Sequence, residues 1–150
     1  MGRRATNHRW WALCLGALLG SPAAVPADER PSFHVIVNAA NPVAALSRIQ
    51  VSRLLLKKVT GWENGKAVEP ADLAEAAPAR EALSQAVHGR GTAAVKSYWQ
   101  QRIFSGADVP PPEFSSDADV VAYVKARRGA IGYVSVVPAD GGVKVVRLLP

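Results

Sequence analysis

The stretch Val68–Gly89 sets the strongest constraint on the fold, because it combines a strand, a loop and a helix. Ala67–Asp72 is typical of a short strand, small residues predict a loop after it, and Pro78 suits the first turn of a helix. The helix should end at Gly89, and its apolar stripe comprises Ala79, Leu83, Ala86 and Val87. A strand that leads through a loop into a helix directs free backbone N–H groups at one point. The stretch therefore predicts α/β structure with a candidate anion site.

Residues 1–27 have the pattern of a secretory signal peptide. Three arginines precede the short apolar run Trp10–Leu19, and small residues follow as far as Ala27. The run is about half as long as the roughly 20 residues that cross a bilayer, so a cleaved signal is favoured over an anchor that stays in place. We therefore predict cleavage near Ala27, a periplasmic or secreted location, and no stable membrane span after cleavage.

The predicted mature chain lacks cysteine and carries a mild charge. Cys14, the only cysteine, lies within the predicted signal, which excludes disulfides and thiol catalysis in the rest of the chain. Of the 18 basic residues three lie in the signal, whereas all 12 acidic residues follow it, so the net charge falls from +6 to +3. The basic residues are scattered singly or in pairs, which argues against a nucleic-acid partner. About 120 residues can bury the core of one domain but not of two.

The elements before the central stretch are a strand and a well-marked helix. Phe33–Asn38 is a nearly continuous apolar run, typical of a strand that is buried on both faces in a parallel sheet. Ser47 and Gln50 have the spacing of a capping box, which predicts a helix that ends near Leu56.

Two further helices and two strands are expected after the central stretch. One helix covers Thr92–Phe104, capped by its first residue, with Ile103 turned inward. The other covers Asp117–Arg127, with Ser116 as N-cap and Gly129 at the position after the C-cap. The expected strands are Ala130–Val136 and Val143–Leu149. The order β-α-β-α-α-α-β-β predicts a single α/β domain.

Catalytic patterns are missing from the sequence. The three histidines, His8, His34 and His88, do not have the spacing of metal ligands. No serine lies in a nucleophile-elbow context, and Asp117 and Asp119 are explained by the positive end of the helix that they begin. We therefore predict no enzyme activity, no cofactor and no metal.

Several segments, taken together, resemble a known family. The segments LSRIQVSRLLLKKVTGW, SYWQQRIFSG and GAIGYV resemble the periplasmic phosphate-binding proteins of ABC transporters, and in particular short phosphate-binding-protein-like (PBP-like) domains. The match runs from Phe33 to Val136. The resemblance implies an α/β fold in residues 28–150: a single three-layer lobe of the type 2 periplasmic-binding-protein kind, with a mixed sheet flanked by helices. Full-length relatives hold an oxyanion between two lobes, so a homodimer or a partner protein would have to supply the second lobe here.

The resemblance also places candidate ligand-binding residues. In the relatives the loop before the central helix carries an Arg-Ala-Asp-Gly-Ser-Gly-Thr type of run, whereas here Leu73 stands for the arginine, Ala77 for the serine and Ala79 for the threonine. Arg80 is the nearest cation, and it could meet a ligand or pair with Asp72 or Glu75. The candidate ligand-binding residues are Asp72, Glu75, Ala76, Ala77, Arg80, Asn38 and Asn41.

Two functions follow from these observations. The first is an exported solute-binding-like protein for phosphate or another small oxyanion, with an altered or lost oxyanion site. The second is an accessory or interaction protein of the cell envelope that keeps the fold without binding a ligand. The missing hydroxyls and arginine weaken phosphate binding, because a phosphate needs several charge-assisted hydrogen bonds to replace its hydration.

Overall fold

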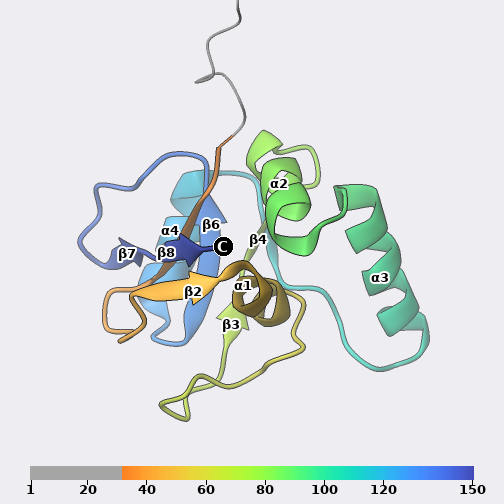
Figure 1. Cartoon of the computed structure of the whole chain (residues 1–150), viewed down its shortest axis with the longest axis horizontal. Coiled ribbons are helices and arrows are strands. Elements are labelled where there is room, and N and C mark those ends of the chain that lie inside the picture. Colours follow the sequence, from red (N-terminus) through yellow and green to blue (C-terminus); the bar gives the residue numbers. More distant parts are fainter. Residues whose placement is uncertain (1–31) are drawn as a thin grey trace, which may run out of the picture.

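A computed structural model describes residues 32–150 (Figure 1). The predicted signal peptide, residues 1–27, lies outside the described residues. The elements are β1 (His34–Asn38), β2 (Ala45–Ser47), α1 (Arg48–Leu55), β3 (Glu69–Pro70), β4 (Asp72–Leu73), α2 (Pro78–Leu83), the π-helix η2 (Ser84–His88), α3 (Thr92–Phe104), β5 (Glu113–Phe114), α4 (Asp117–Ala126), β6 (Ala130–Val134), β7 (Val143–Val145) and β8 (Arg147–Leu149). Within residues 32–150, no helix is both long enough and apolar enough to span a membrane.

The central sheet has four strands in the order β3-β6-β1-β7. Strand β1 runs antiparallel to both β6 and β7, whereas β3 runs parallel to β6. The prediction of a mixed sheet is confirmed. The interpretation of Phe33–Asn38 as a strand of a parallel sheet is wrong. A continuous apolar run indicates that a strand is buried on both faces, but it does not indicate whether the neighbouring strands run parallel or antiparallel.

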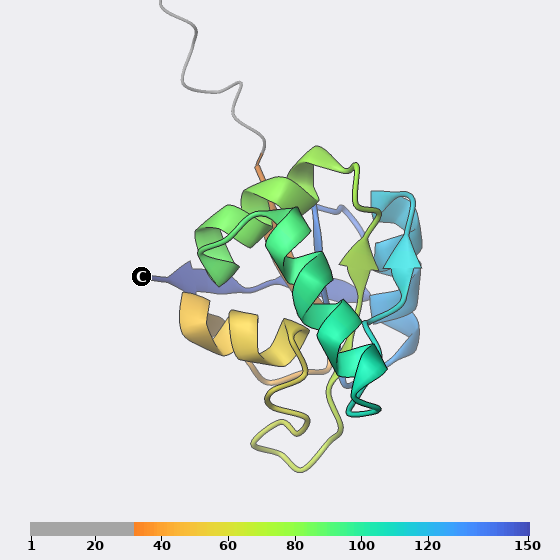
Figure 2. The same cartoon turned by 90° about the vertical axis from the view of Figure 1, so that its right-hand side faces the viewer.

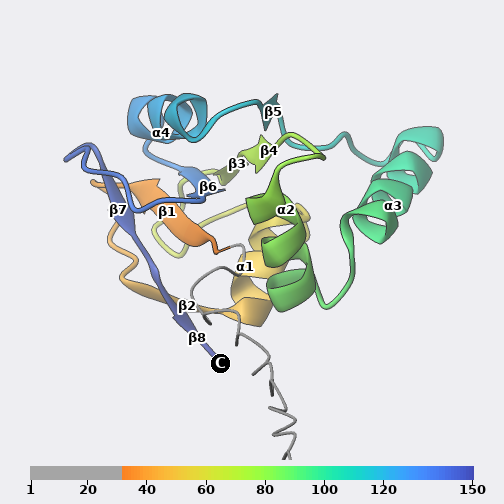
Figure 3. The same ribbon diagram turned by 90° about the horizontal axis from the view of Figure 1, so that it is seen from above.

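Helices cover both faces of this sheet, as predicted for a three-layer lobe. Figure 3 shows α4 on one side of β6 and β1, and α1 and α2 on the other side. Gly132 of β6 lets α4 come close, since a Cβ atom there would lie only 2.8 Å from Val120 Cγ1. The largest fully buried side chains come from the sheet and from helices on both of its faces: Tyr133, Ile36, Leu83, Ile131, Val51, Val120 and Val124.

The predicted capping box of α1 is confirmed. The Gln50 N–H donates to Ser47 Oγ at 3.2 Å, and the Ser47 N–H donates to Gln50 Oε1 at 2.8 Å. The helix ends at Leu55 with Leu56 as its C-cap. Trp62, in the loop that follows, is 8% exposed and donates its Nε1–H to the Gly129 carbonyl at 2.9 Å.

Two predicted strands are each divided, because the chain changes partner within them. In the stretch Ala67–Asp72, the Ala71 N–H donates to Ile131 O at 2.8 Å, whereas the Asp72 N–H donates to Pro112 O at 3.0 Å. β3 therefore joins the main sheet, and β4 pairs with β5 instead. The predicted strand Val143–Leu149 is divided in the same way into β7, which pairs with β1, and β8, which pairs with β2.

The helix ends agree with the sequence in part. The bounds of α3 match the prediction, but its N-cap is Gly91, and Thr92 instead donates its Oγ1–H to Glu81 Oε2 at 2.8 Å. Ile103 was expected to point inward and is 49% exposed. The central helix reaches Gly89 as predicted, but its last turn is the π-helix η2. Gly129 does not follow the C-cap of α4, because α4 ends at Ala126 and Arg127 is its C-cap.

Candidate functional site

Arg80 points into the protein interior, where it joins three elements. It is 5% exposed, and its Nη1 donates to Leu73 O and to Glu113 Oε1, both at 2.6 Å. Its Nη2 lies 3.3 Å from Asp72 Oδ2. Of the two alternatives left open by the sequence, the structure therefore shows the ion pair with Asp72. Glu113 was missed, because it lies 33 residues away in the chain and no local pattern connects it to Arg80.

Asp72 is the most strongly buried carboxylate of this cluster. Its Oδ1 accepts hydrogen bonds from the Tyr133 hydroxyl and from the Leu73 N–H. Burial raises the pKa of Asp72 above its usual value, and the Arg80 guanidinium opposes this shift. Burial, with help from Asp72, also raises the pKa of Tyr133. Burial acts to lower the pKa of Arg80, but Asp72 and Glu113 outweigh it, so Arg80 stays protonated.

The other candidates in the loop face outward. Glu75 is exposed and pairs with Lys96 of α3, with its Oε2 2.9 Å from Lys96 Nζ. Ala76 is exposed and Ala77 is half-buried. Both charged neighbours of this loop, Glu75 and Arg80, thus have protein partners.

Asn38 is the last residue of β1, and Asn41 lies in the turn that follows it. The Asn38 Nδ2 donates to the carbonyls of Val124 and Lys125 at 3.0 and 2.9 Å, which satisfies the last turn of α4. Asn41 is 3% exposed, and its Oδ1 accepts from the Val43 N–H at 3.0 Å. The structure therefore brings Asp72 and Arg80 together and holds the two asparagines at a different end of the sheet.

A pocket of about 420 Å³ opens where α2 and α4 begin. Among the predicted residues only Ala77 lines it. Its walls hold four serines, one carboxylate and four apolar residues, and none of its lining residues is a lysine or arginine: Ser32, Leu73, Ala77, Pro78, Ala79, Ser115, Ser116, Asp117 and Ser135. Sequence reasoning missed the serines as site residues, although the predicted helix cap at Ser116 marked the position of Ser115 and Ser116 at the start of α4.

Asp117 occupies the hydrogen-bond donors on one side of this pocket. Its Oδ2 accepts three hydrogen bonds at the end of β6, from the Ser135 N–H at 2.8 Å, the Ser135 hydroxyl at 2.6 Å and the Val136 N–H at 3.2 Å. An anion that entered the pocket would meet a fixed negative charge, and three donors would already be occupied.

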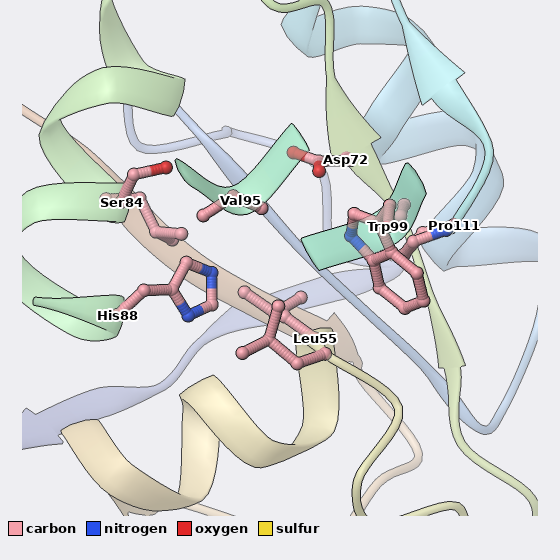
Figure 4. Close-up of a pocket in the computed structure, with 10 residues that line it drawn as sticks. Leu55, Asp72, Ser84, His88, Val95, Trp99 and Pro111 are labelled. Carbon is pink, nitrogen blue, oxygen red and sulfur yellow. The ribbon is translucent and has the colours of Figure 1, made fainter. Parts of the chain in front are cut away.

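A second, much smaller cavity lies beside the Arg80 cluster. Figure 4 shows that Leu55 of α1, Asp72 of β4, Ser84 and His88 of η2, and Val95 and Trp99 of α3 surround it. Its volume is about 10 Å³, which is roughly one water molecule. It is too small for a solute. Within residues 32–150, no group of three His, Cys, Asp or Glu side chains could hold a metal ion.

His88 at this cavity should make the protein sensitive to acid. Burial, followed by the charges of Arg90, Lys58 and Arg80, lowers the pKa of His88 from 6.5 to about 4. A lowered pKa means that the unfolded chain binds the proton more tightly, so stability falls as the pH drops from 6.5 toward 4. We expect protonation of His88 alone to lower the free energy of unfolding at about pH 5 by about 2 kcal/mol relative to neutral pH. Urea unfolding at both ends of this range should show a smaller loss for His88→Gln, and an equal loss would contradict the prediction.

Comparison with protein-family models finds no match, and comparison with curated proteins finds no significant match. Solved structures do match. A phosphate ABC transporter substrate-binding protein with bound phosphate from Clostridium perfringens superposes with a TM-score of 0.61 at 19% identity, over 77% of this chain and 44% of that chain. An ABC-type phosphate transport receptor from Vibrio cholerae gives 0.60 at 17% identity, over 77% of this chain and 45% of that chain. A possible phosphate-binding protein from Planctomyces limnophilus gives 0.59 at 15% identity, over 78% and 41%.

These matches establish the fold. The names of the three proteins describe binding or transport, and none of them names an enzyme. This chain spans less than half the length of each solved structure that it matches. Residues 32–150 thus have the α/β fold of part of a type 2 periplasmic binding protein, with the phosphate-binding proteins of ABC transporters as structural neighbours.

Proposed function

We propose that this chain is an exported solute-binding-like protein and that residues 32–150 form a lobe whose oxyanion site is altered. The proposal rests on the pocket of about 420 Å³ between the first turns of α2 and α4. Export rests on the signal-like pattern of residues 1–27. The neighbours that bind phosphate support a small oxyanion as the ligand class to test first.

The side chains that border the pocket disfavour tight phosphate binding. The nearest arginine, Arg80, is held by Asp72 and Glu113 in the interior. At the start of α2, Pro78 has no N–H, and Ala77 and Ala79 have no side-chain donor. Phosphate carries up to two negative charges, and replacing its hydration takes several charge-assisted hydrogen bonds.

What remains in the pocket suits weak binding of a small polar solute. Three of the four serine hydroxyls already donate within the protein, to Ser135 O, Asp119 Oδ2 and Asp117 Oδ2, so they offer a solute mainly acceptor oxygens. The first turn of α4 directs its dipole at the same space. The pocket is open on one side, and small-ligand sites usually enclose most of the ligand. A second lobe, supplied by another copy of the chain or by a partner protein, would close it.

The test is equilibrium dialysis of the mature chain with labelled phosphate, sulfate and molybdate. The wild type should bind in the millimolar range. Asp117→Ala removes the fixed charge and frees the donors of Ser135 and Val136, so it should bind oxyanions about tenfold more tightly. Asp119→Ala is the comparison variant: it removes the same charge from the same helix turn, but it frees only one pocket donor, the Ser116 hydroxyl, instead of three. It should raise affinity clearly less than Asp117→Ala does, by about threefold at most.

Two results would contradict the proposal. Micromolar binding of phosphate by the wild type would show that the oxyanion site is intact. Lack of uptake by both the wild type and Asp117→Ala at millimolar ligand would remove the solute-binding function.

The second result would favour the accessory or interaction protein. A specific observation supports this alternative: Val136 and Val137, next to the pocket, are 70% and 54% exposed. They border a groove of about 470 Å³ along α4 that also contains Val121 and Pro138. Exposed apolar surface of this kind marks interaction sites.

A further inference from the structure

The carboxyl end of α3 carries the most exposed large apolar side chain described in the protein. Phe104 is 90% exposed, Val109 is 60% exposed and Ile103 is 49% exposed. We call these three residues the α3 tip. Burying a phenylalanine side chain is worth about 1.5–3 kcal/mol, so a surface that covered Phe104 would gain this stabilisation.

Helix α3 contributes little to the main core. Its buried residues Val95 and Trp99 pack with Leu56 in a small cluster that is separate from the main core. Figure 3 shows α3 at the edge of the molecule, away from the central sheet, and Figure 2, which views the molecule from that side, shows it in front, beside α2. The position of the helix leaves its far end free to meet another surface.

The surroundings of the α3 tip are positively charged. Helix α3 contains no acidic residue, and none occurs between Glu81 and Asp108. Lys58 Nζ and Arg102 Cζ each lie 5.6 Å from the centre of the Tyr98 ring. Lys57 Nζ donates to Val109 O at 2.8 Å and pairs with Asp108 Oδ1 at 3.3 Å. Lys57 thus contacts the tip and pairs with Asp108, Arg102 directly precedes Ile103 in α3, and Lys58 lies beside the same Tyr98 ring as Arg102.

We propose that the α3 tip docks on a membrane surface that contains anionic phospholipid. Lys58 and Arg102 complement the charge of the headgroup phosphates, and Phe104 and Ile103 enter the apolar boundary below them. The bilayer is favoured over a protein partner because the tip projects from the end of a helix. A fluid interface accepts a projecting aromatic ring, whereas a protein would need a matching pocket. The docking uses residues outside the pocket at α2 and α4, so it is independent of solute binding.

The test is co-sedimentation of the mature chain with vesicles of phosphatidylcholine alone and with vesicles that also contain phosphatidylglycerol. The wild type should sediment only with the anionic vesicles and should be released by added salt. Phe104→Ser should weaken the apparent affinity about tenfold or more, and Lys58→Gln should weaken it about fivefold. Because Phe104 and Lys58 are exposed, unchanged urea midpoints will show that both variants fold.

A matched control separates the tip from exposed apolar surface in general. Val136 is 70% exposed and belongs to the connection between β6 and β7. In Figure 1 this connection lies on the opposite side of the molecule from α3. Val136→Ser should sediment like the wild type. The proposal is overturned if anionic vesicles fail to sediment the wild type, if Phe104→Ser sediments equally well, or if polyglutamate captures the chain while the vesicles do not.

Discussion

Replacing Arg80 with methionine is expected to lower the free energy of unfolding by about 3–5 kcal/mol. The change keeps much of the apolar volume of the side chain but removes every hydrogen bond of the guanidinium. Asp72, whose side chain is 16% exposed, and the carbonyl of Leu73 would then lack a cation partner in the interior. Urea unfolding of the purified variant, followed by circular dichroism, measures the loss.

Two further variants separate the buried pair from general effects of charge. Arg90→Met removes an exposed arginine and should cost less than about 0.5 kcal/mol. Adding Asp72→Asn to Arg80→Met should recover part of the loss, because a neutral amide is cheaper to bury than an unpaired carboxylate. A loss below about 1 kcal/mol for Arg80→Met would mean that the cluster is a weak interaction, as exposed ion pairs are.

Gly129→Ala is expected to cost about 3 kcal/mol, because overpacking against backbone atoms cannot be relieved by a rotamer change. A Cβ atom at this position would lie 2.0 Å from the carbonyl oxygen of Ala67. The Gly129 carbonyl also accepts the Trp62 Nε1–H at 2.9 Å and the Glu69 N–H at 3.0 Å. Moving the segment at Ala67 away from Gly129 would therefore disturb the pairing of β3 with β6 and the hydrogen bond that holds Trp62.

The measurement is again urea unfolding, now together with tryptophan fluorescence, which reports the environment of Trp62. Gly141→Ala is the matched control, since a Cβ there would meet no heavy atom within 4 Å. It should leave both the unfolding midpoint and the fluorescence maximum unchanged. Equal unfolding midpoints for the two alanine variants would contradict the prediction, because they would show that the backbone near Ala67 can move without loss of stability.

The local elements were predictable because their signals lie within a few residues of one another. The Ser47 and Gln50 side chains bond each other's backbone three positions apart, so the start of α1 followed from sequence alone. The Ser116 cap of α4 is of the same kind, with the Asp119 N–H donating to Ser116 Oγ at 3.2 Å. The bounds of α3 followed from its apolar spacing, although its N-cap did not, because the carboxylate that bonds Thr92 belongs to Glu81.

The candidate site was predictable only in outline. The strand-loop-helix unit before α2 indicated where backbone donors would point, and a pocket does open there. Its polar wall comes from Ser115, Ser116 and Asp117, which follow the loop by about forty residues, and from Ser135. No local pattern connects these positions, so the sequence named Asn38 and Asn41 instead, which the structure places elsewhere.

By itself, the sequence predicted where the helices lie and that the fold is α/β, and both predictions are confirmed. Only the tertiary structure decided how the strands pair, that Arg80 joins Glu113, and that Asp117 occupies the donors of Ser135 and Val136. The physical reason is the range of the interactions. Caps and apolar stripes act between neighbours in the chain, whereas the Tyr133–Asp72 hydrogen bond joins residues 61 positions apart and exists only once the sheet has formed.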